Sequence, residues 1–255
     1  MPIGESPSPH AEARRAFPAG LEQPEGSFRF SVDALLLAAF AVSRTADVTI
    51  RFVDLGTGCG VVGLACLLLK SNKCRGFGID CNPELINVAQ KNTAKLGFSD
   101  RFALHTGELA DARFLETLRM EASPVQLVMA NPPWRLVGSG RLPATEARRK
   151  ALFGDKGTFP LFASAASSLL EEDGRFVCII SPDRLQDMLA ALDGAGLTPY
   201  LLQYIHKQKT SPATFVLIEA RKGAHAKPSV AEPIALYGPE RFFTLESLAF
   251  CPFLR

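Results

Sequence analysis

The feature that most constrains the fold is a repeated alternation of short apolar runs with helical segments between residues 50 and 130. Apolar, β-branched runs are typical of strands, and the amphipathic segments between them are typical of helices. The runs lack the polar alternation of a half-exposed sheet, which indicates parallel strands covered by helices on both faces. Right-handed crossovers place the carboxyl ends of such strands at one edge, so we expect the chemistry there.

The individual elements follow from these patterns and from their flanking Pro, Gly and capping residues. An apolar helix is expected after Ser31, with Asp33 as the lone charge near its start. Strands are expected over residues 50–55, 76–79, 102–105, 125–130 and 175–180, with helices over residues 60–70, 83–96, 111–120 and 159–170. Residues 201–205 and 215–219 are expected to pair as an antiparallel hairpin. The prediction is an α/β fold with a mostly parallel seven-stranded sheet, helices on both faces and this final hairpin.

The two ends of the chain differ in composition from this central part. Residues 1–26 are rich in Pro, Glu, Ser and Gly without an apolar period, which predicts a flexible leader with no regular structure. Residues 27–225 are expected to form one domain with its N-terminal helix. Residues 226–255 combine prolines with several phenylalanines and leucines, so we expect an irregular strap packed on that domain.

Composition narrows the class of protein. The chain has 255 residues of which 47% are hydrophobic, enough for a large core, and its net charge of +2 does not by itself indicate a nucleic-acid partner. Its longest apolar runs, residues 34–42 and 61–69, fall far short of the roughly 18 residues of a membrane span. The N-terminus lacks an apolar signal segment, and the six cysteines include no C-x-x-C pair or zinc-ligand spacing. We therefore expect a soluble cytoplasmic protein, without disulfides, metal or membrane contact.

A glycine-rich turn is predicted where the first strand gives way to the next helix. Its glycines, Gly56, Gly58 and Gly60, follow Asp54, and such residues let the backbone approach a ligand closely. The N–H groups at the start of the helix can donate hydrogen bonds to a polar or anionic group. Asp80 lies 20 residues after Gly60, at the end of the second predicted strand, where a carboxylate can bind both hydroxyls of an adenosine ribose. The pattern predicts a nucleotide-cofactor site.

Two other interpretations of this turn have to be weighed. A glycine triplet alone can be a tight structural turn beside a surface carboxylate, although the order of strand, turn, helix, strand and acid argues against that. The letters Gly58-Cys-Gly60-Val-Val-Gly63 also satisfy the G-x-G-x-x-G pattern of NAD sites. A match by letter alone is weak evidence for an NAD site.

The sequence Asn131-Pro132-Pro133-Trp134 follows the fourth strand directly, at the same edge as the glycine turn. Two prolines fix the backbone and remove two N–H donors, so the loop presents acceptors, namely the Asn131 side-chain oxygen and the Pro132 carbonyl. Two fixed acceptors suit a planar NH2 group, and Trp134 offers an aromatic face for the ring that carries it. The alternative is a proline-rich loop with a core tryptophan.

These motifs resemble those of a known family. Residues 54–60, DLGTGCG, resemble motif I of class I S-adenosylmethionine methyltransferases, and NPPW resembles the NPPY signature of members that methylate amide or exocyclic amine nitrogens, with Trp in place of Tyr. The resemblance covers residues 28–223 and is strongest to the bacterial tRNA (valine) adenine-N6 methyltransferases, which share FRFSVDALLLAAF at 28–40 and the glycines before Arg141. It implies a Rossmann-like fold, S-adenosylmethionine as cofactor and N6 of an adenosine near the anticodon of a tRNA as the acceptor.

The resemblance also implies roles for further residues. Glu108 occupies the position of an acid that faces the cofactor adenine, and Trp134 and Phe30 are expected to hold the unstacked base. Residues 134–160 carry six Lys or Arg against two acidic residues, a local excess that favours RNA phosphate beside the pocket. The expected RNA contacts in this segment are Arg141, Arg148, Arg149 and Lys150.

Two alternative functions remain open. A glutamine-N5 protein methyltransferase of the release-factor type uses the same amide-holding chemistry, but usually carries a separate N-terminal helical domain for which 26 residues and one helix are too few. A non-catalytic cofactor- or RNA-binding module is the other alternative, and the intact Asn131 argues against it. The expected quaternary state is a monomer or a weak homodimer.

Overall fold

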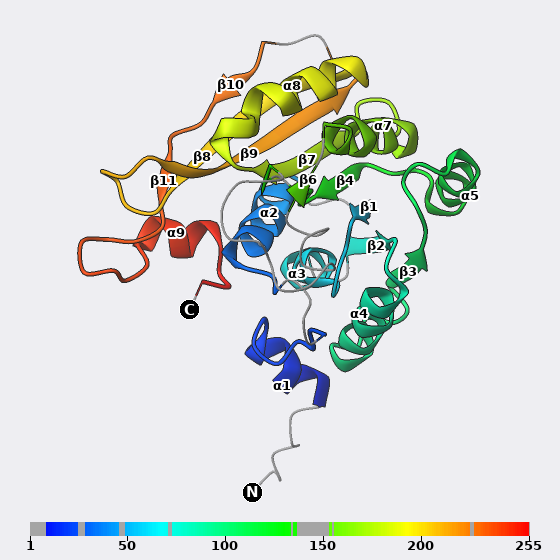
Figure 1. The fold of residues 1–255 in the computed structure, drawn as a ribbon. Helices are drawn as coiled ribbons and strands as arrows, with labels where there is room; N and C mark the ends of the chain where they lie inside the picture. The colour runs from blue at the N-terminus through cyan, green and yellow to red at the C-terminus, as the bar shows by residue number, and fades with distance from the viewer. Residues whose placement is uncertain are drawn as a thin grey trace, which may run out of the picture.

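A mixed β-sheet with helices on both faces forms the centre of the computed structural model (Figure 1). The structure describes residues 9–24, 29–45, 49–70, 73–133, 135–136, 153–154, 156–224 and 227–254. Within this part of the chain the sheet has nine strands, in the order β10-β8-β9-β7-β4-β1-β2-β3, with β11 paired to β8. The strands are β1 Ile50–Leu55, β2 Cys74–Asp80, β3 Phe102–Thr106, β4 Leu127–Ala130, β7 Arg175–Ile180, β8 Leu197–His206, β9 Ala213–Lys222, β10 Ser229–Val230 and β11 Ile234–Ala235.

The sheet confirms the predicted mostly parallel arrangement with a final antiparallel hairpin. Strands β3, β2, β1, β4 and β7 are parallel, whereas β9 is antiparallel to both β7 and β8. The prediction of seven strands is short by two, because β10 and β11 extend the sheet beside β8. Each of these strands has two residues and lies near Pro228 or Pro233, so no local pattern could indicate it.

Two hydrophobic layers cover the two faces of the sheet. Because successive side chains of a strand point to opposite faces, Phe52 joins the layer formed with α2 and α3, and Val53 joins the layer formed with α5, α7 and α8. The helices are α1 Pro9–Ala16, α2 Val32–Ser43, α3 Val61–Lys70, α4 Pro83–Lys95, α5 Ala112–Ala122, α7 Thr158–Leu169, α8 Leu185–Gly194 and α9 Leu245–Phe250. A 3-10 turn, Pro182–Arg184, precedes α8. Strands β5 Arg135–Leu136 and β6 Phe153–Gly154 pair with each other apart from the main sheet.

The expectation that residues 1–26 have no regular structure is wrong for residues 9–16, which form α1. Arg14 donates from Nε to the Leu96 carbonyl at 2.8 Å and from Nη2 to the Gly97 carbonyl at 3.2 Å. These acceptors lie at the carboxyl end of α4, where carbonyls have no partner within their own helix. The helix is therefore held by a tertiary contact that its local composition does not reveal.

The C-terminal segment packs into the core in the described structure. Cys251 and Leu254 are buried, and the ring of Phe253 lies 4.8 Å from that of Phe17, so residues near both ends of the chain meet. Figure 1 shows α9 close to the β11 edge of the sheet, away from β3. This segment adds core volume beside α2 and β8.

One buried charge cluster lies between β7, β9 and the end of α2. Glu219 on β9 is fully buried. Its Oε2 accepts from Arg175 Nη1 at 3.5 Å and lies 3.5 Å from Arg44 Nε, and its Oε1 accepts from Arg221 Nε at 3.0 Å. Burial lowers the pKa of Arg175, which Glu219 opposes. Glu219 is the acid that the three guanidinium groups share, so the cluster depends on it.

Candidate functional site

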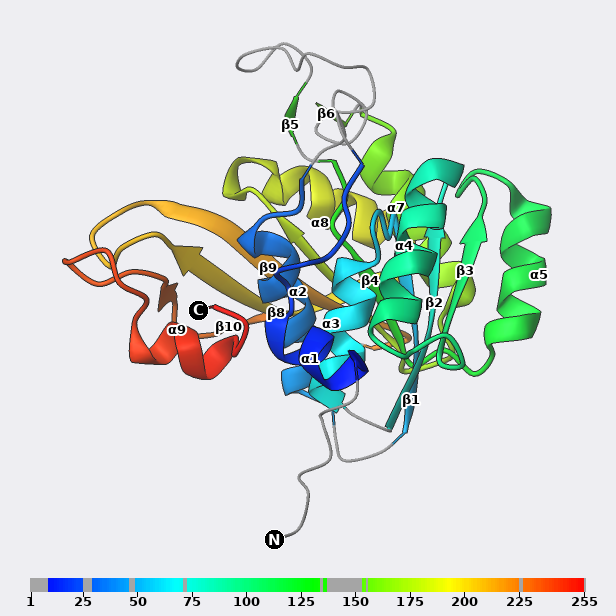
Figure 2. The ribbon, with the colours of Figure 1, turned by 90° about the horizontal axis from the view of Figure 1, so that it is seen from below.

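The candidate site is built where three neighbouring strands end together. Leu55 of β1 is in register with Ile79 of β2 on one side and with Ala130 of β4 on the other. The next residue along each strand is a predicted site residue: Gly56, Asp80 and Asn131. Adjacent strands lie about 4.8 Å apart, so the sequence motifs converge on one edge. In Figure 2 the arrowhead of β3 points towards this carboxyl edge, which is the end of the molecule where β5 and β6 lie.

The turn between β1 and α3 has the backbone conformation that its glycines permit. Gly56, Gly58 and Gly60 have φ angles of 69°, 57° and 87°, in the left-handed region that disfavours other residues. A Cβ atom built on Gly58 would meet nothing within 4 Å, so the outer side of the turn is open. An approaching ligand can therefore reach the backbone at Gly58.

Asp54 lies beneath this turn and holds its shape. Its side chain is buried, and Oδ2 accepts from Thr57 Oγ1 at 2.7 Å and from the backbone N–H of Gly63 at 3.2 Å. Burial raises the pKa of Asp54 to about 7, although both hydrogen bonds act in the opposite direction. These contacts link the end of β1 to the first turn of α3.

Asp80 faces the open side of the same turn. Oδ2 accepts from Gly58 N at 3.0 Å, and Oδ1 accepts from Asn82 N at 2.9 Å. Burial raises its pKa, and the nearby charge of Glu108 adds to the effect. A carboxylate has about four acceptor positions, so two hydrogen bonds leave capacity for two ligand hydroxyls. The free acceptor positions thus fit the hydroxyls of the ribose of an adenosyl cofactor.

Asn131 stands at the end of β4 with its amide held by a residue from α2. Asn131 Nδ2 donates to Asp33 Oδ2 at 2.8 Å, and the two residues are 98 positions apart in the chain. Pro132 is buried and Pro133 is half-buried. The loop after β4 is therefore anchored on the layer of helices that includes α2.

The remaining predicted site residues fall into two groups. Glu108 is exposed just after β3, and Phe30 is half-buried, with its backbone N–H donating to Gln23 Oε1 at 3.1 Å. The others lie outside the described residues: Trp134, Arg141, Arg148, Arg149 and Lys150. The structure thus brings the cofactor motif and Asn131 together, and the stacking and basic residues stay predictions.

Sequence reasoning did not assign two polar residues that support the site. In the sequence Asp33 is only a charge near a helix start, although a lone acid in an otherwise apolar helix is a usable signal. Asn92 on α4 is fully buried, and its amide donates to the Cys59 carbonyl at 2.9 Å and to the Glu22 carbonyl at 3.0 Å. Asn92 therefore ties the N-terminal segment to the glycine turn.

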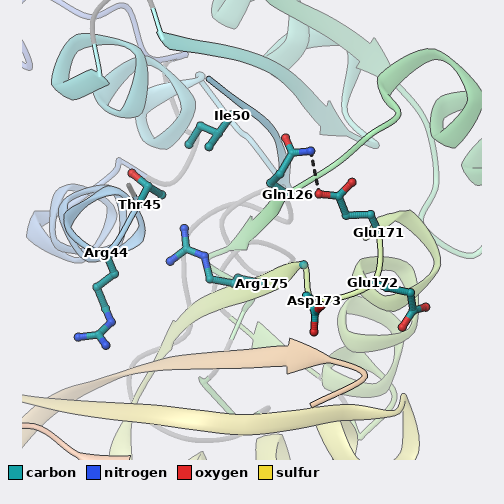
Figure 3. A pocket seen from close by; sticks show the side chains of 9 residues that line it. Arg44, Thr45, Ile50, Gln126, Glu171, Glu172, Asp173 and Arg175 are labelled. Atoms are coloured by element: carbon teal, nitrogen blue, oxygen red, sulfur yellow. Dashed lines mark hydrogen bonds between the residues drawn. The ribbon is translucent and has the colours of Figure 1, made fainter. Parts of the chain in front are cut away.

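A separate depression of about 210 Å³ lies at the amino ends of the parallel strands, opposite the carboxyl ends that form the candidate site (Figure 3). It is lined by residues at the amino ends of β1, β4 and β7, including Ile50, Gln126 and Arg175. It therefore lies away from the candidate site. Among the described residues, no group of three or more His, Cys, Asp or Glu side chains could hold a metal ion, and no helix is long and apolar enough to cross a membrane.

Comparisons with known proteins agree with the motifs. A family model described as a methyltransferase domain matches residues 46–193. A tRNA1(Val) (adenine(37)-N6)-methyltransferase of Porphyromonas gingivalis is 30% identical over 171 residues, which are 66% of this chain and 64% of that protein. A release factor glutamine methyltransferase of Rhodospirillum rubrum is 28% identical over 189 residues, 71% of this chain and 54% of that protein. The chain thus spans less than two thirds of the length of these curated relatives.

A solved structure supports the fold. The crystal structure of a predicted O-methyltransferase from Agrobacterium tumefaciens aligns with a TM-score of 0.67 and 22% identity, covering 87% of this chain and 96% of that one. Together with the sheet order, this likeness confirms the predicted Rossmann-like α/β fold.

Proposed function

The chain belongs to the family of S-adenosylmethionine-dependent methyltransferase domains, and on that premise we propose that it methylates an exocyclic amino nitrogen, N6 of an adenosine near the anticodon of a tRNA. The observation that carries this proposal is Asn131 in an NPPW sequence at the end of β4, one strand away from the glycine turn. Bound S-adenosylmethionine supplies a methyl carbon attached to a positively charged sulfur.

The chain's own residues would hold that cofactor from two sides. Asp80 would accept hydrogen bonds from the ribose hydroxyls with the acceptor capacity that Gly58 and Asn82 leave free. Gly58 would let the cofactor approach the backbone, since the space where its side chain would lie is open. Asp54 would act indirectly, through the shape of the turn.

The acceptor amine needs help because its lone pair is delocalised into the ring. Asn131 Oδ1 and the Pro132 carbonyl would each accept a hydrogen bond from one of the two N–H groups of the amine. These hydrogen bonds would favour a tetrahedral nitrogen and direct its lone pair at the methyl carbon. Catalysis would consist mainly of positioning and electrostatic stabilisation, which preorganised acceptors provide without reorganisation. Trp134 would stack on the base that carries the amine.

The tRNA part of the proposal has two supports. The relative from Porphyromonas gingivalis is named as a tRNA adenine-N6 methyltransferase. The segment that follows Asn131 carries the excess of Lys and Arg described above, which suits an RNA backbone. A second candidate is methylation of a glutamine side-chain amide in a protein, because the relative from Rhodospirillum rubrum carries that name.

Labelled methyl transfer separates the two candidates. The chain would be incubated with methyl-labelled S-adenosylmethionine and either unmodified total tRNA or a release-factor domain, followed by nucleoside or peptide analysis. The proposal expects label in N6-methyladenosine and none in glutamine. Label in glutamine with untouched tRNA would transfer the assignment to the second candidate. Asn131→Ala provides the control for contaminating activity.

A further inference from the structure

A buried carboxylate contacts the side chain on which the proposed reaction depends. Asp33 lies in the first turn of α2 and is 3% exposed. One of its oxygens accepts from Asn131 Nδ2 at 2.8 Å, and the other accepts from the hydroxyl of Ser31. Residues 34–42 of the same helix are all buried and apolar, so Asp33 is the one charged side chain of its buried surface.

The chemistry of this contact determines which way the Asn131 amide faces. A carboxylate can only accept hydrogen bonds, so it pairs with the NH2 end of an amide and repels the oxygen end. Asn131 therefore turns Oδ1 away from Asp33. An amide without such a partner is nearly symmetric in shape and can present either end to a substrate.

Burial of a carboxylate is costly unless charge and hydrogen-bond partners compensate it. In Asp33 the two side-chain donors and the amino-terminal end of α2 provide that compensation. One of these partners is the residue at the end of β4, so the contact joins the helix layer to the candidate site.

We propose that Asp33 is a positioning residue that fixes the Asn131 amide with Oδ1 towards the acceptor amine. This inference rests on the proposed function, because the orientation matters only if Oδ1 accepts an N–H bond from the substrate. With the amide reversed, two N–H donors would face each other, and the lone pair of the amine would lose its alignment. Asp33 would thus contribute to kcat without touching substrate or cofactor.

The main test compares Asp33→Ala with Asp33→Asn. Asp33→Ala removes the hydrogen-bond partner of the Asn131 amide. Because a misplaced catalytic group slows the reaction, kcat is expected to fall by about 10- to 100-fold. KM and cofactor affinity are expected to stay within roughly threefold of wild type. Asp33→Asn can still offer an oxygen to Asn131 Nδ2 and is expected to recover most of the activity. Ser31→Ala is the matched control, because it removes the other partner of the carboxylate and leaves the Asn131 contact in place.

A spectroscopic arm makes the test independent of the substrate. The side-chain amide resonances of Asn131, assigned by their loss in Asn131→Ala, are expected to move in Asp33→Ala and to move less in Ser31→Ala. If wild-type protein methylates no amine, the proposed function fails, and these resonances still decide the orientation. If Asp33→Ala does not fold, Asp33→Val, which fills more of the space without an acceptor oxygen, supplies the comparison and is expected to show the same loss of kcat and the same movement of the resonances. Unmoved resonances, or a kcat of Asp33→Ala within twofold of wild type, would overturn the inference.

Discussion

The carboxylate of Asp80 accepts the backbone N–H of Gly58 at 3.0 Å and so joins the end of β2 to the glycine turn after β1. The contact holds the turn at a residue whose outer side is open, and it places an acid directly beside that opening. Any ligand that reaches Gly58 must therefore lie next to Asp80.

We expect Asp80→Ala to weaken binding of S-adenosylmethionine by about 10- to 150-fold, the equivalent of roughly 1.5–3 kcal/mol for lost hydrogen bonds to a charged group. Titration calorimetry measures the change directly. Asp100→Ala is the matched control, since Asp100 is exposed at the other end of the sheet, before β3. Equal affinities of the two variants, or tight binding of NAD in place of the methyl donor, would remove the cofactor assignment.

Asn131→Ala is expected to abolish methyl transfer, with kcat at least about 100-fold lower, while cofactor affinity stays within roughly twofold of wild type. The reason is that Asn131 Oδ1 would act on the acceptor amine in the transition state more than on the bound cofactor. Single-turnover rates and calorimetry together measure both quantities. An active variant would place the chemistry elsewhere, and a collapse of cofactor affinity would mean that Asn131 is structural.

Trp134 is the only tryptophan of the chain, so its fluorescence has an unambiguous origin. Because we propose that it stacks on the target base, unmodified tRNA is expected to quench its emission, and Trp134→Phe should keep more activity than Trp134→Ala. Equal activities of the Phe and Ala variants would contradict stacking.

Binding of tRNA should also weaken steeply as the salt concentration rises. The slope of log affinity against log salt concentration is expected to fall by about one for each basic contact removed, for example in Arg141→Ala.

Elements dominated by local pattern were predictable from the sequence. The bounds of β1 and β7 agree with the prediction residue for residue, because most residues of both strands are apolar and buried. The predicted fourth strand begins two residues before β4 does, although the backbone of Gln126 still donates to the Arg51 carbonyl at 3.1 Å and accepts from the N–H of Arg175 at 2.9 Å. Strand ends of this kind depend on backbone pairing, which apolar periodicity cannot locate to within one or two residues.

The long-range contacts of the site were not predictable from one sequence. The partners Asp33 and Asn131 are separated by 98 positions, and only the folded arrangement of α2 over β4 brings them together. Helix α1 escaped prediction for a similar reason, because its Arg14 binds carbonyls that belong to the end of α4. In both cases the contact joins residues far apart in the chain, which residue composition does not encode.

The buried Asp54 predicts a pH dependence of stability. Burial raises its pKa from 3.8 to about 7, so the folded state binds the proton more tightly than the unfolded state does. Ionisation therefore costs stability, and this contribution is present below about pH 4 and is lost as the pH rises to about 7, by up to about 4 kcal/mol. We expect Asp54→Asn, which has no proton to lose, to become more stable relative to wild type across this window. Urea unfolding at several pH values measures the difference, and parallel curves for the two proteins would contradict it.

The buried cluster around Glu219 predicts a large and specific loss of stability. Glu219 is fully buried and compensates Arg175 and Arg221, so Glu219→Ala leaves a buried guanidinium without its partner. Breaking a buried pair in this way is expected to cost about 3–5 kcal/mol, and Glu219→Gln should cost less because its oxygen can still accept a hydrogen bond. Glu172→Ala is the matched control: its side chain is 78% exposed and lies 3.8 Å from Lys222, so a change below about 1 kcal/mol is expected. Denaturant unfolding compares the variants, and equal midpoints for Glu219→Ala and Glu172→Ala would show that the cluster adds no specific stability.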